Sequence, residues 1–277
     1  MILAPLSLLA PPASAGPALH TYQALAVAGW PGGVLSDTQV GARWELSPGS
    51  RSILFEDTFV DLGGRASVSP AFVELGPKVV FAPIAVFDLA LQATVIRYVS
   101  PRFGPMGYDG LLGTLDSART DRWRAGFGFT GWGTTLQASP TFKGRVGPSV
   151  FVSSWNVSRV SVAAPEGIDS PYVFEPYRGM VIEWTDTTVE HLSAVMWEPY
   201  DGSDGPMLRL GGALRGKYAD RSPEAILTAG FVGMGRPGDN PNVPQFTAIV
   251  LPYVLDPERV GRAPFVAVLA EWDVTRR

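Results

Sequence analysis

Met207–Tyr218, with the sequence MLRLGGALRGKY, alternates between two kinds of side chain. At a period of two, one face carries leucines, glycines and a tyrosine, and the other carries Arg209, Arg215 and Lys217. Successive side chains of a β-strand point to opposite faces, whereas a helix would place Arg209 and Leu210 only about 100° apart. The stretch is therefore predicted to be a strand whose two faces meet different solvents.

The same alternation returns along most of the chain. Val34–Leu46 and Val86–Ser100 are further examples, and Gly, Pro, Asp and Asn gather between such segments. About thirteen candidate strands of roughly 9–16 residues result, whereas membrane-spanning strands need about 9–11 residues and sandwich strands average about 5–6. Because bacterial single-chain barrels normally have an even number of strands, we predict an all-β, antiparallel transmembrane β-barrel of about 12 strands, with 14 the next choice.

Turn-forming residues set the expected strand boundaries. Gly63-Gly64-Arg65 is predicted to end one strand, and Ser139-Pro140 to separate strands at 123–138 and 142–158. Proline has no N–H for a central ladder, so the segment around Pro83 is predicted to connect two strands tightly. Residues 179–188 offer room for one further short strand.

Composition supports a membrane barrel and argues against several other classes. Of 277 residues, 46% are hydrophobic and 17% charged, which is below the roughly 25% charged residues of average soluble domains. Yet no run approaches the roughly 18 apolar residues that a membrane helix needs. The net charge of −4 and the pI near 5.3 argue against a nucleic-acid partner. Cysteine is absent, so disulfides, thiol nucleophiles and Cys-ligated metals are excluded.

The first fifteen residues resemble an export signal. Ile2–Leu9 is a short apolar core, and Ala13-Ser14-Ala15 has the small-x-small pattern of a cleavage site before Gly16. No Lys or Arg occurs before Arg43, so a start further upstream or an unstructured apolar terminus are the alternatives. We expect a signal peptide at 1–15 and a single β-barrel domain at 16–277, with a long loop at about 101–121.

From about Leu19 to Val274 the pattern resembles bacterial outer-membrane β-barrel proteins, without a specific family motif. The resemblance implies an integral protein in the outer membrane of a Gram-negative cell, reached through the periplasm. It also implies outer-membrane lipid and the barrel insertion machinery as partners. Such proteins typically end in a strand that closes with an aromatic residue. Trp272 corresponds to that residue, although Thr275-Arg276-Arg277 follow it and depart from the family pattern.

If the apolar strand faces meet lipid, the charged faces point into the lumen. An Arg or Lys on the lipid face near the bilayer midplane costs about 2–4 kcal/mol, so charged strand residues are expected inside. The lumen-facing candidates are Asp37, Arg43, Glu45, Asp88, Arg124, Arg209, Arg215 and Lys217. They would line a narrow, porin-like pore for a small solute that the sequence does not identify, or pair as a salt-bridged structural lumen.

Aromatic residues are predicted to form a girdle at the membrane interfaces, where an apolar ring meets a polar edge. The candidates are Trp30, Trp44, Trp123, Trp155, Trp197, Tyr218 and Trp272. Two segments also share a short phrase, Glu175-Pro176-Tyr177-Arg178-Gly179 and Glu198-Pro199-Tyr200-Asp201-Gly202. Five residues do not establish a repeat. Because Pro-x-x-Gly suits a strand end, these tyrosines are interpreted as interface residues too.

Residues that carry chemistry are few. The two histidines, His20 and His191, do not form a metal-ligand cluster, so neither a metal nor a cofactor is predicted. On a strand His191 and Ser193 share a face, but Glu190 points the other way, so a Ser–His–acid site would lack its acid.

We therefore predict no catalytic residue and a non-enzymatic barrel. The first alternative is a secreted, soluble β-sandwich or lipocalin-like binder, whose apolar faces would converge on one interior. The second is a membrane-embedded lipid hydrolase that uses His191 with Ser193.

Overall fold

The computed structural model describes residues 17–28, 33–47, 58–101, 104–108, 128–166, 171–201, 207–222, 225–236, 244–255 and 264–273. Every regular element in these ranges is a β-strand. None of the described segments is a helix long and apolar enough to cross a membrane. The expected signal peptide, most of the expected loop at 101–121, Trp30, Trp123 and Arg124 lie outside the described residues.

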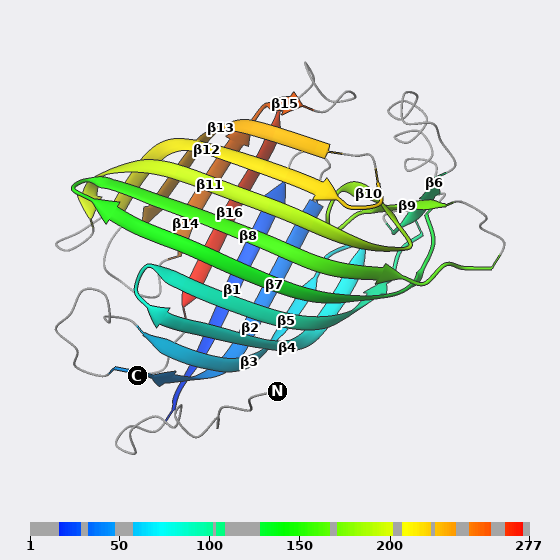
Figure 1. Ribbon diagram of the computed structural model, residues 1–277, viewed down its shortest axis with the longest axis horizontal. Coiled ribbons are helices and arrows are strands. Elements are labelled where there is room, and N and C mark those ends of the chain that lie inside the picture. Colours follow the sequence, from blue (N-terminus) through cyan, green and yellow to red (C-terminus); the bar gives the residue numbers. More distant parts are fainter. Residues whose placement is uncertain are drawn as a thin grey trace, which may run out of the picture.

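Twelve strands form the wall of a closed, antiparallel barrel (Figure 1). They are β1 (Ala18–Ala28), β2 (Gly33–Glu45), β3 (Phe59–Val68), β4 (Phe72–Ile84), β5 (Phe87–Tyr98), β7 (Gly131–Val146), β8 (Ser149–Val162), β11 (Thr185–Asp201), β12 (Met207–Ala219), β13 (Ala225–Arg236), β14 (Gln245–Leu251) continued by β15 (Tyr253–Leu255), and β16 (Phe265–Asp273). Each strand pairs with its neighbour along the chain, and β16 pairs with β1, with Leu25 opposite Ala270. The predicted all-β barrel of 12 strands is confirmed.

The two ends of the barrel differ in what they carry. Neighbouring strands alternate in direction, so β1 begins and β16 ends at the same end, here called the terminal end (Figure 1). A separate three-stranded sheet of β6 (Met106–Tyr108), β9 (Tyr172–Glu175) and β10 (Met180–Glu183) lies at the opposite end, here called the hairpin end. The short strand for which residues 179–188 offered room is β10, and it lies outside the barrel wall.

Side chains along each wall strand alternate between the outer face and the lumen. Every wall strand has a large apolar side chain exposed on its outer face. Examples in strand order are Leu25, Val40, Leu62, Leu75, Leu91, Leu136, Phe151, Val195, Leu210, Phe231, Val250 and Val268. Charged residues such as Asp37, Asp61 and Glu74 are buried on the inner face. A β-sandwich buries its apolar faces against each other, so the closed wall with apolar side chains outside excludes the sandwich alternative.

The expected strand end at Gly63-Gly64-Arg65 is wrong. All three residues pair in the ladder between β3 and β4, and the strand continues to Val68. The turn lies at residues 69–71, where the Ser69 hydroxyl accepts hydrogen bonds from the N–H groups of Ala71 and Phe72, each at 3.1 Å. The serine hydroxyl stabilises a turn at this point because it accepts hydrogen bonds from two backbone N–H groups. The glycines permit a turn but do not stabilise one.

The expected turn at Ser139-Pro140 is also wrong, because β7 continues through it to Val146. The ladder between β7 and β8 has pairs on both sides of this point, and none is formed at 139 or 140. Pro140 therefore lies at a position where the ladder between β7 and β8 forms no pair, so the N–H that proline lacks is not needed there. The turn is at Gly147-Pro148, where Gly147 adopts a φ of 57° that disfavours residues with a Cβ. The tight connection expected at Ala82–Ala85 is present but begins later, at Ala85-Val86, because β4 continues through Pro83 to Ile84.

Candidate functional site

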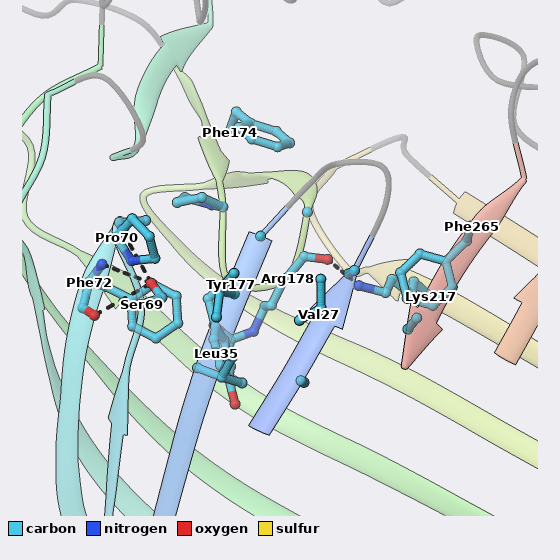
Figure 2. Close-up of a pocket in the computed structure, with 18 of the residues that line it drawn as sticks. Val27, Leu35, Ser69, Pro70, Phe72, Phe174, Tyr177, Arg178, Lys217 and Phe265 are labelled. Carbon is cyan, nitrogen blue, oxygen red and sulfur yellow. Dashed lines mark hydrogen bonds between the residues drawn. The ribbon is translucent and has the colours of Figure 1, made fainter. Parts of the chain in front are cut away.

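A hairpin from the connection between β8 and β11 folds into the mouth of the barrel. This lumen hairpin comprises β9, the turn 176–179 and β10. Glu175 and the turn contact inward-facing side chains of separate wall strands: Phe72 of β4, Tyr98 of β5, Thr135 of β7 and Lys217 of β12. Contacts with so many strands place the tip of the hairpin inside the lumen, as Figure 2 shows for Tyr177 and Arg178.

Glu175 organises the turn of the lumen hairpin. Its carboxylate accepts hydrogen bonds from the N–H of Tyr177 at 3.1 Å and of Arg178 at 2.8 Å, and from the Tyr98 hydroxyl at 2.9 Å. Its carbonyl accepts a hydrogen bond from the N–H of Gly179 at 2.8 Å. Gly179 has a φ of 64°, which closes the turn at a position where other residues would be strained. One buried carboxylate thus fixes both the turn and its docking to the wall.

Arg178 is the largest fully buried side chain in the described part of the protein. Its guanidinium donates hydrogen bonds to Glu175 at 3.2 Å and to Thr135 at 3.3 Å, and Lys217 donates one to its carbonyl oxygen (Figure 2). Burial by itself would lower the pKa of Arg178, but the Glu175 carboxylate overcomes this and raises it. The guanidinium therefore stays charged inside the barrel, as one half of a buried ion pair.

Tyr177 is not an interface residue, contrary to the interpretation of the Glu-Pro-Tyr phrase. Its ring meets Phe72 edge-on, with the ring centroids 5.1 Å apart, and its hydroxyl hydrogen-bonds with Arg65. Burial raises the pKa of Tyr177, although the Arg65 cation opposes the shift. A neutral phenol packed among lumen side chains anchors the hairpin from the side opposite Lys217. Of the corresponding Tyr200 in the second phrase, only its place in β11 is described.

Apolar packing adds to these polar contacts. Val173, Met180 and Ile182 of the lumen hairpin are fully buried in one cluster with Ile96 and Val160 of the wall. Val181, on the other side of β10, is also fully buried. Because both faces of the hairpin are covered, its docking removes apolar surface from water at roughly 25 cal/mol per Å². The hairpin is therefore part of the folded core at this end of the barrel.

The charged residues proposed for the lumen lie in ion pairs. Six of the candidates pair as follows: Asp37 with Arg65 at 2.7 Å, Arg43 with Asp61 at 3.3 Å, Asp88 with Lys143 at 3.3 Å, Arg209 with Glu198 at 2.6 Å, and Arg215 and Lys217 with Glu190 at 3.3 and 3.4 Å. Glu45 is exposed at the last position of β2. Removing Arg65 would leave the Asp37 carboxylate without this ion-pair partner in the lumen, whereas Glu190 would keep one cation after the loss of either Arg215 or Lys217.

The partners of these residues were missed in the sequence, although a signal was present. Arg65 and Glu190 sit at inward positions of their strands, which a count of alternate residues identifies once the strand boundaries are right. For β3 the mistaken break at Gly63 hid this count. Glu175 and Arg178 gave no such signal, because charged residues in a turn ordinarily face water.

The aromatic candidates occupy different depths. Trp44 and Trp272 are half-buried close to the terminal end of β2 and β16, and Trp197 is 55% exposed on β11. Tyr218 is 49% exposed near the hairpin end of β12. Trp155 lies near the middle of β8, away from either strand end, with its ring centroid 4.1 Å from that of His191.

His191 belongs to a small polar cluster on the outer face of the barrel. Its Nε2 atom lies 2.7 Å from the Ser193 hydroxyl oxygen and 3.4 Å from that of Ser153, and the Ser193 hydroxyl donates to Ser153 at 2.9 Å. Glu190 points the other way, into the lumen, where it pairs with Arg215. His20 faces the lumen and contacts Asp61 at 3.0 Å. Among the described residues, no group of three or more His, Asp or Glu side chains is placed to hold a metal ion.

Beside the lumen hairpin, the mouth contains a cavity of about 660 Å³. Its walls come from β1, β2, β12, β13 and β16, from the turn between β3 and β4, and from the hairpin itself (Figure 2). Phe72, Phe174, Ile226 and Phe265 make its lining mainly apolar. At the hairpin end, the lumen hairpin therefore occupies one part of the lumen and this cavity another.

Comparison with known proteins gives distant structural likenesses only. No family model matches the chain, and no curated protein gives a significant match. Among solved structures, CdiB from Acinetobacter baumannii has a TM-score of 0.34 at 10% identity over 92% of this chain, and the chain spans 60% of that protein. Salmonella typhi OmpF, in a complex with daunomycin, has a TM-score of 0.29 at 10% identity over 93% of this chain and 98% of its own. Neither likeness assigns a family or an activity to this chain.

Proposed function

We propose that this protein is an integral outer-membrane barrel, non-enzymatic, whose lumen is held closed by the inward hairpin and by ion-paired side chains. The observation that carries the proposal is the inverted distribution of side chains. Large apolar residues are exposed outside, and charged residues are buried inside. A soluble barrel would have the opposite arrangement, because water would meet its outer face.

The apolar outer face supports the membrane location. Monomeric soluble proteins rarely expose contiguous apolar patches larger than a few hundred Å². Here exposed apolar side chains occur on all twelve wall strands, so the apolar surface encircles the barrel. Arg97 and Arg159, the charged residues that face outward from described wall strands, both lie close to the hairpin end. An aliphatic band with cations at its edge fits the core and boundary of a bilayer.

The lumen supports closure rather than an open pore. The lumen hairpin docks through hydrogen bonds of Glu175 with Tyr98 and of Arg178 with Thr135, and through an apolar cluster at the mouth. Toward the terminal end, the Glu198 carboxylate lies between Arg145 and Arg209, at 3.0 and 2.6 Å. Side chains that bind one another across a narrow lumen leave less room for a hydrated solute.

Labelling at single cysteines tests the membrane location, since the chain contains no native cysteine. In lipid vesicles, a fluorophore attached to the outward-facing position of Leu214→Cys is expected to be quenched strongly by nitroxide-labelled lipid. The matched control is Arg145→Cys, whose native side chain faces the lumen and is half exposed, and its label is expected to be quenched weakly. Equal quenching at the two positions, or recovery of the protein from cells without detergent, would contradict an integral barrel.

A second candidate function is the hydrolysis of lipid esters, and the outer-face cluster is the observation that favours it. A serine hydroxyl within hydrogen-bond reach of a histidine is the minimal nucleophile–base pair. Ser193 and His191 meet that distance, and their position on the outer face would give them direct access to lipid. The described contacts of the His191 ring are with serines and Trp155, so an orienting carboxylate is missing from this arrangement.

An ester-hydrolysis assay separates the two candidates. The non-enzymatic barrel predicts that the purified protein releases no more fatty acid from phospholipid vesicles than do the variants His191→Ala and Ser193→Ala. General-base catalysis typically contributes about 10²–10⁴-fold, so release that falls at least 100-fold in both variants would establish the hydrolase instead. Ser36→Ala, a change at an outward position on β2, is the control for altered folding.

A further inference from the structure

The cavity beside the lumen hairpin combines an apolar wall with charge of one sign. Its charged lining residues are Arg178, Arg215 and Lys217, all of them cations. The carboxylates that pair with them, Glu175 and Glu190, are not part of the lining. The lining cations and their ion-pair partners thus number three cations and two carboxylates.

One of these cations, Arg215, is placed where a ligand head would meet it. Arg215 lies with its guanidinium 4.9 Å from the centre of the Phe265 ring, so an apolar surface and a cation adjoin in the cavity. The Arg215 side chain is 27% exposed, which leaves part of the guanidinium available to a ligand. Lys217 reaches the backbone of the hairpin from the same strand face (Figure 2).

The volume also fits a small amphiphile. Pockets for small molecules are typically about 300–1,000 Å³, largely apolar, with a few polar groups that fix the orientation. A cavity of about 660 Å³ lies within this range. An apolar chain would pack against Phe72, Phe174 and Phe265, and an anionic head would lie beside Arg215 and Lys217.

We propose that this cavity binds a single-chain amphiphilic anion, of the class of medium-chain fatty carboxylates. A cationic head would be repelled by the lining charges, and a neutral head would gain hydrogen bonds from them without the charge attraction that an anion gains. The inference deepens the proposed function, because the ligand would occupy the mouth of the barrel that we propose to be closed. It does not depend on closure, since binding and conductance are measured separately.

Binding is tested on the full chain folded in an amphipathic polymer, which avoids competition from detergent. The probe is dodecanoate, with dodecyltrimethylammonium as the cation of equal chain length. We expect saturable binding of dodecanoate and at least tenfold weaker binding of the ammonium compound. A dodecanoate analogue with a diazirine near the end of its chain is expected to cross-link to residues that line the cavity, in particular Phe174 and Phe265.

Three variants locate the site. Ala267→Trp fills the cavity and should abolish binding, whereas Ala270→Trp, on the outward face of the same strand, should leave it unchanged. Lys217→Met should weaken dodecanoate binding at least tenfold without adding bulk, and heat-modifiable gel mobility checks that each variant has folded. The inference would be overturned by equal affinity for dodecanoate and dodecyltrimethylammonium. It would also be overturned by cross-links confined to outward residues, or by undiminished binding to Ala267→Trp. Conductance of the wild-type barrel would overturn closure and leave this inference standing.

Discussion

Replacing residues 164–183 with a short Gly-Ser turn is expected to convert a barrel without regular conductance into one that shows stable conductance steps in planar bilayers. The change removes the lumen hairpin, and with it the contacts of Tyr177, Arg178 and Glu175 at the mouth. It should preserve the wall, because the Val162 N–H already donates to the Trp184 carbonyl at 2.8 Å. β8 and β11 would then be joined as an ordinary antiparallel hairpin.

The control for this experiment keeps the hairpin and changes a neighbouring connection. Replacing residues 220–222 of the turn between β12 and β13 alters the same end of the barrel without removing the hairpin. This variant is expected to stay closed. Closure by the lumen hairpin would be disproved by regular conductance in the wild-type protein, or by a folded hairpin-deletion variant that stays silent. In the latter case the ion-paired side chains alone would block the lumen.

Neutralising one member of the Glu175–Arg178 pair is expected to release the hairpin from the lumen. The two side chains are 0% and 2% exposed, so either charge left alone would be buried without its partner. Loss of one partner of a buried ion pair costs about 3–5 kcal/mol, which raises an opening equilibrium by roughly two to three and a half orders of magnitude. The readout is the labelling rate of Val181→Cys, a position that is fully buried when the hairpin is docked.

A double-mutant cycle separates the charge interaction from general disruption. Arg178→Met leaves the carboxylate without its cation, and Glu175→Gln leaves the guanidinium without its anion. The double variant has neither charge, and its glutamine can still accept hydrogen bonds from the turn and from Tyr98. We therefore expect the double variant to open much less than the sum of the single changes predicts. Strictly additive effects, or labelling rates that stay at the wild-type value, would show that the pair does not hold the hairpin.

The wall of the barrel was largely predictable because its signal is local. A strand with lipid on one side and a lumen on the other must alternate along its own length, so Met207–Tyr218 identified β12 within one residue. Errors arose where two local signals competed. Glycines at 63–64 and a proline at 140 suggested turns, but pairing with the adjacent strands continued on either side of them. A proline inside a strand is tolerated when no hydrogen bond of the ladder needs the N–H that it lacks.

The position of the lumen hairpin in the mouth was decided by tertiary structure. In the sequence, Glu175-Pro176-Tyr177-Arg178-Gly179 has the composition of an exposed turn, and its charges would normally remain in water. Its partners Phe72, Tyr98 and Lys217 are distant along the chain and meet it only after the wall has closed around the lumen. The cavity likewise forms only when the curved wall brings several strands around the lumen. The outer-face contact of His191 with Ser153 forms only when β11 pairs with β8.

The sequence by itself therefore determined the strand class and the polarity of each strand face, since these follow from a period of two along single segments. It left the strand number between 12 and 14, and 12 was preferred because bacterial single-chain barrels normally have an even number of strands. Only the tertiary structure decided which charges pair, which loop enters the lumen and where space remains for a ligand. Those features depend on distances between residues that are far apart in the chain, and alternation along one strand carries no information about them.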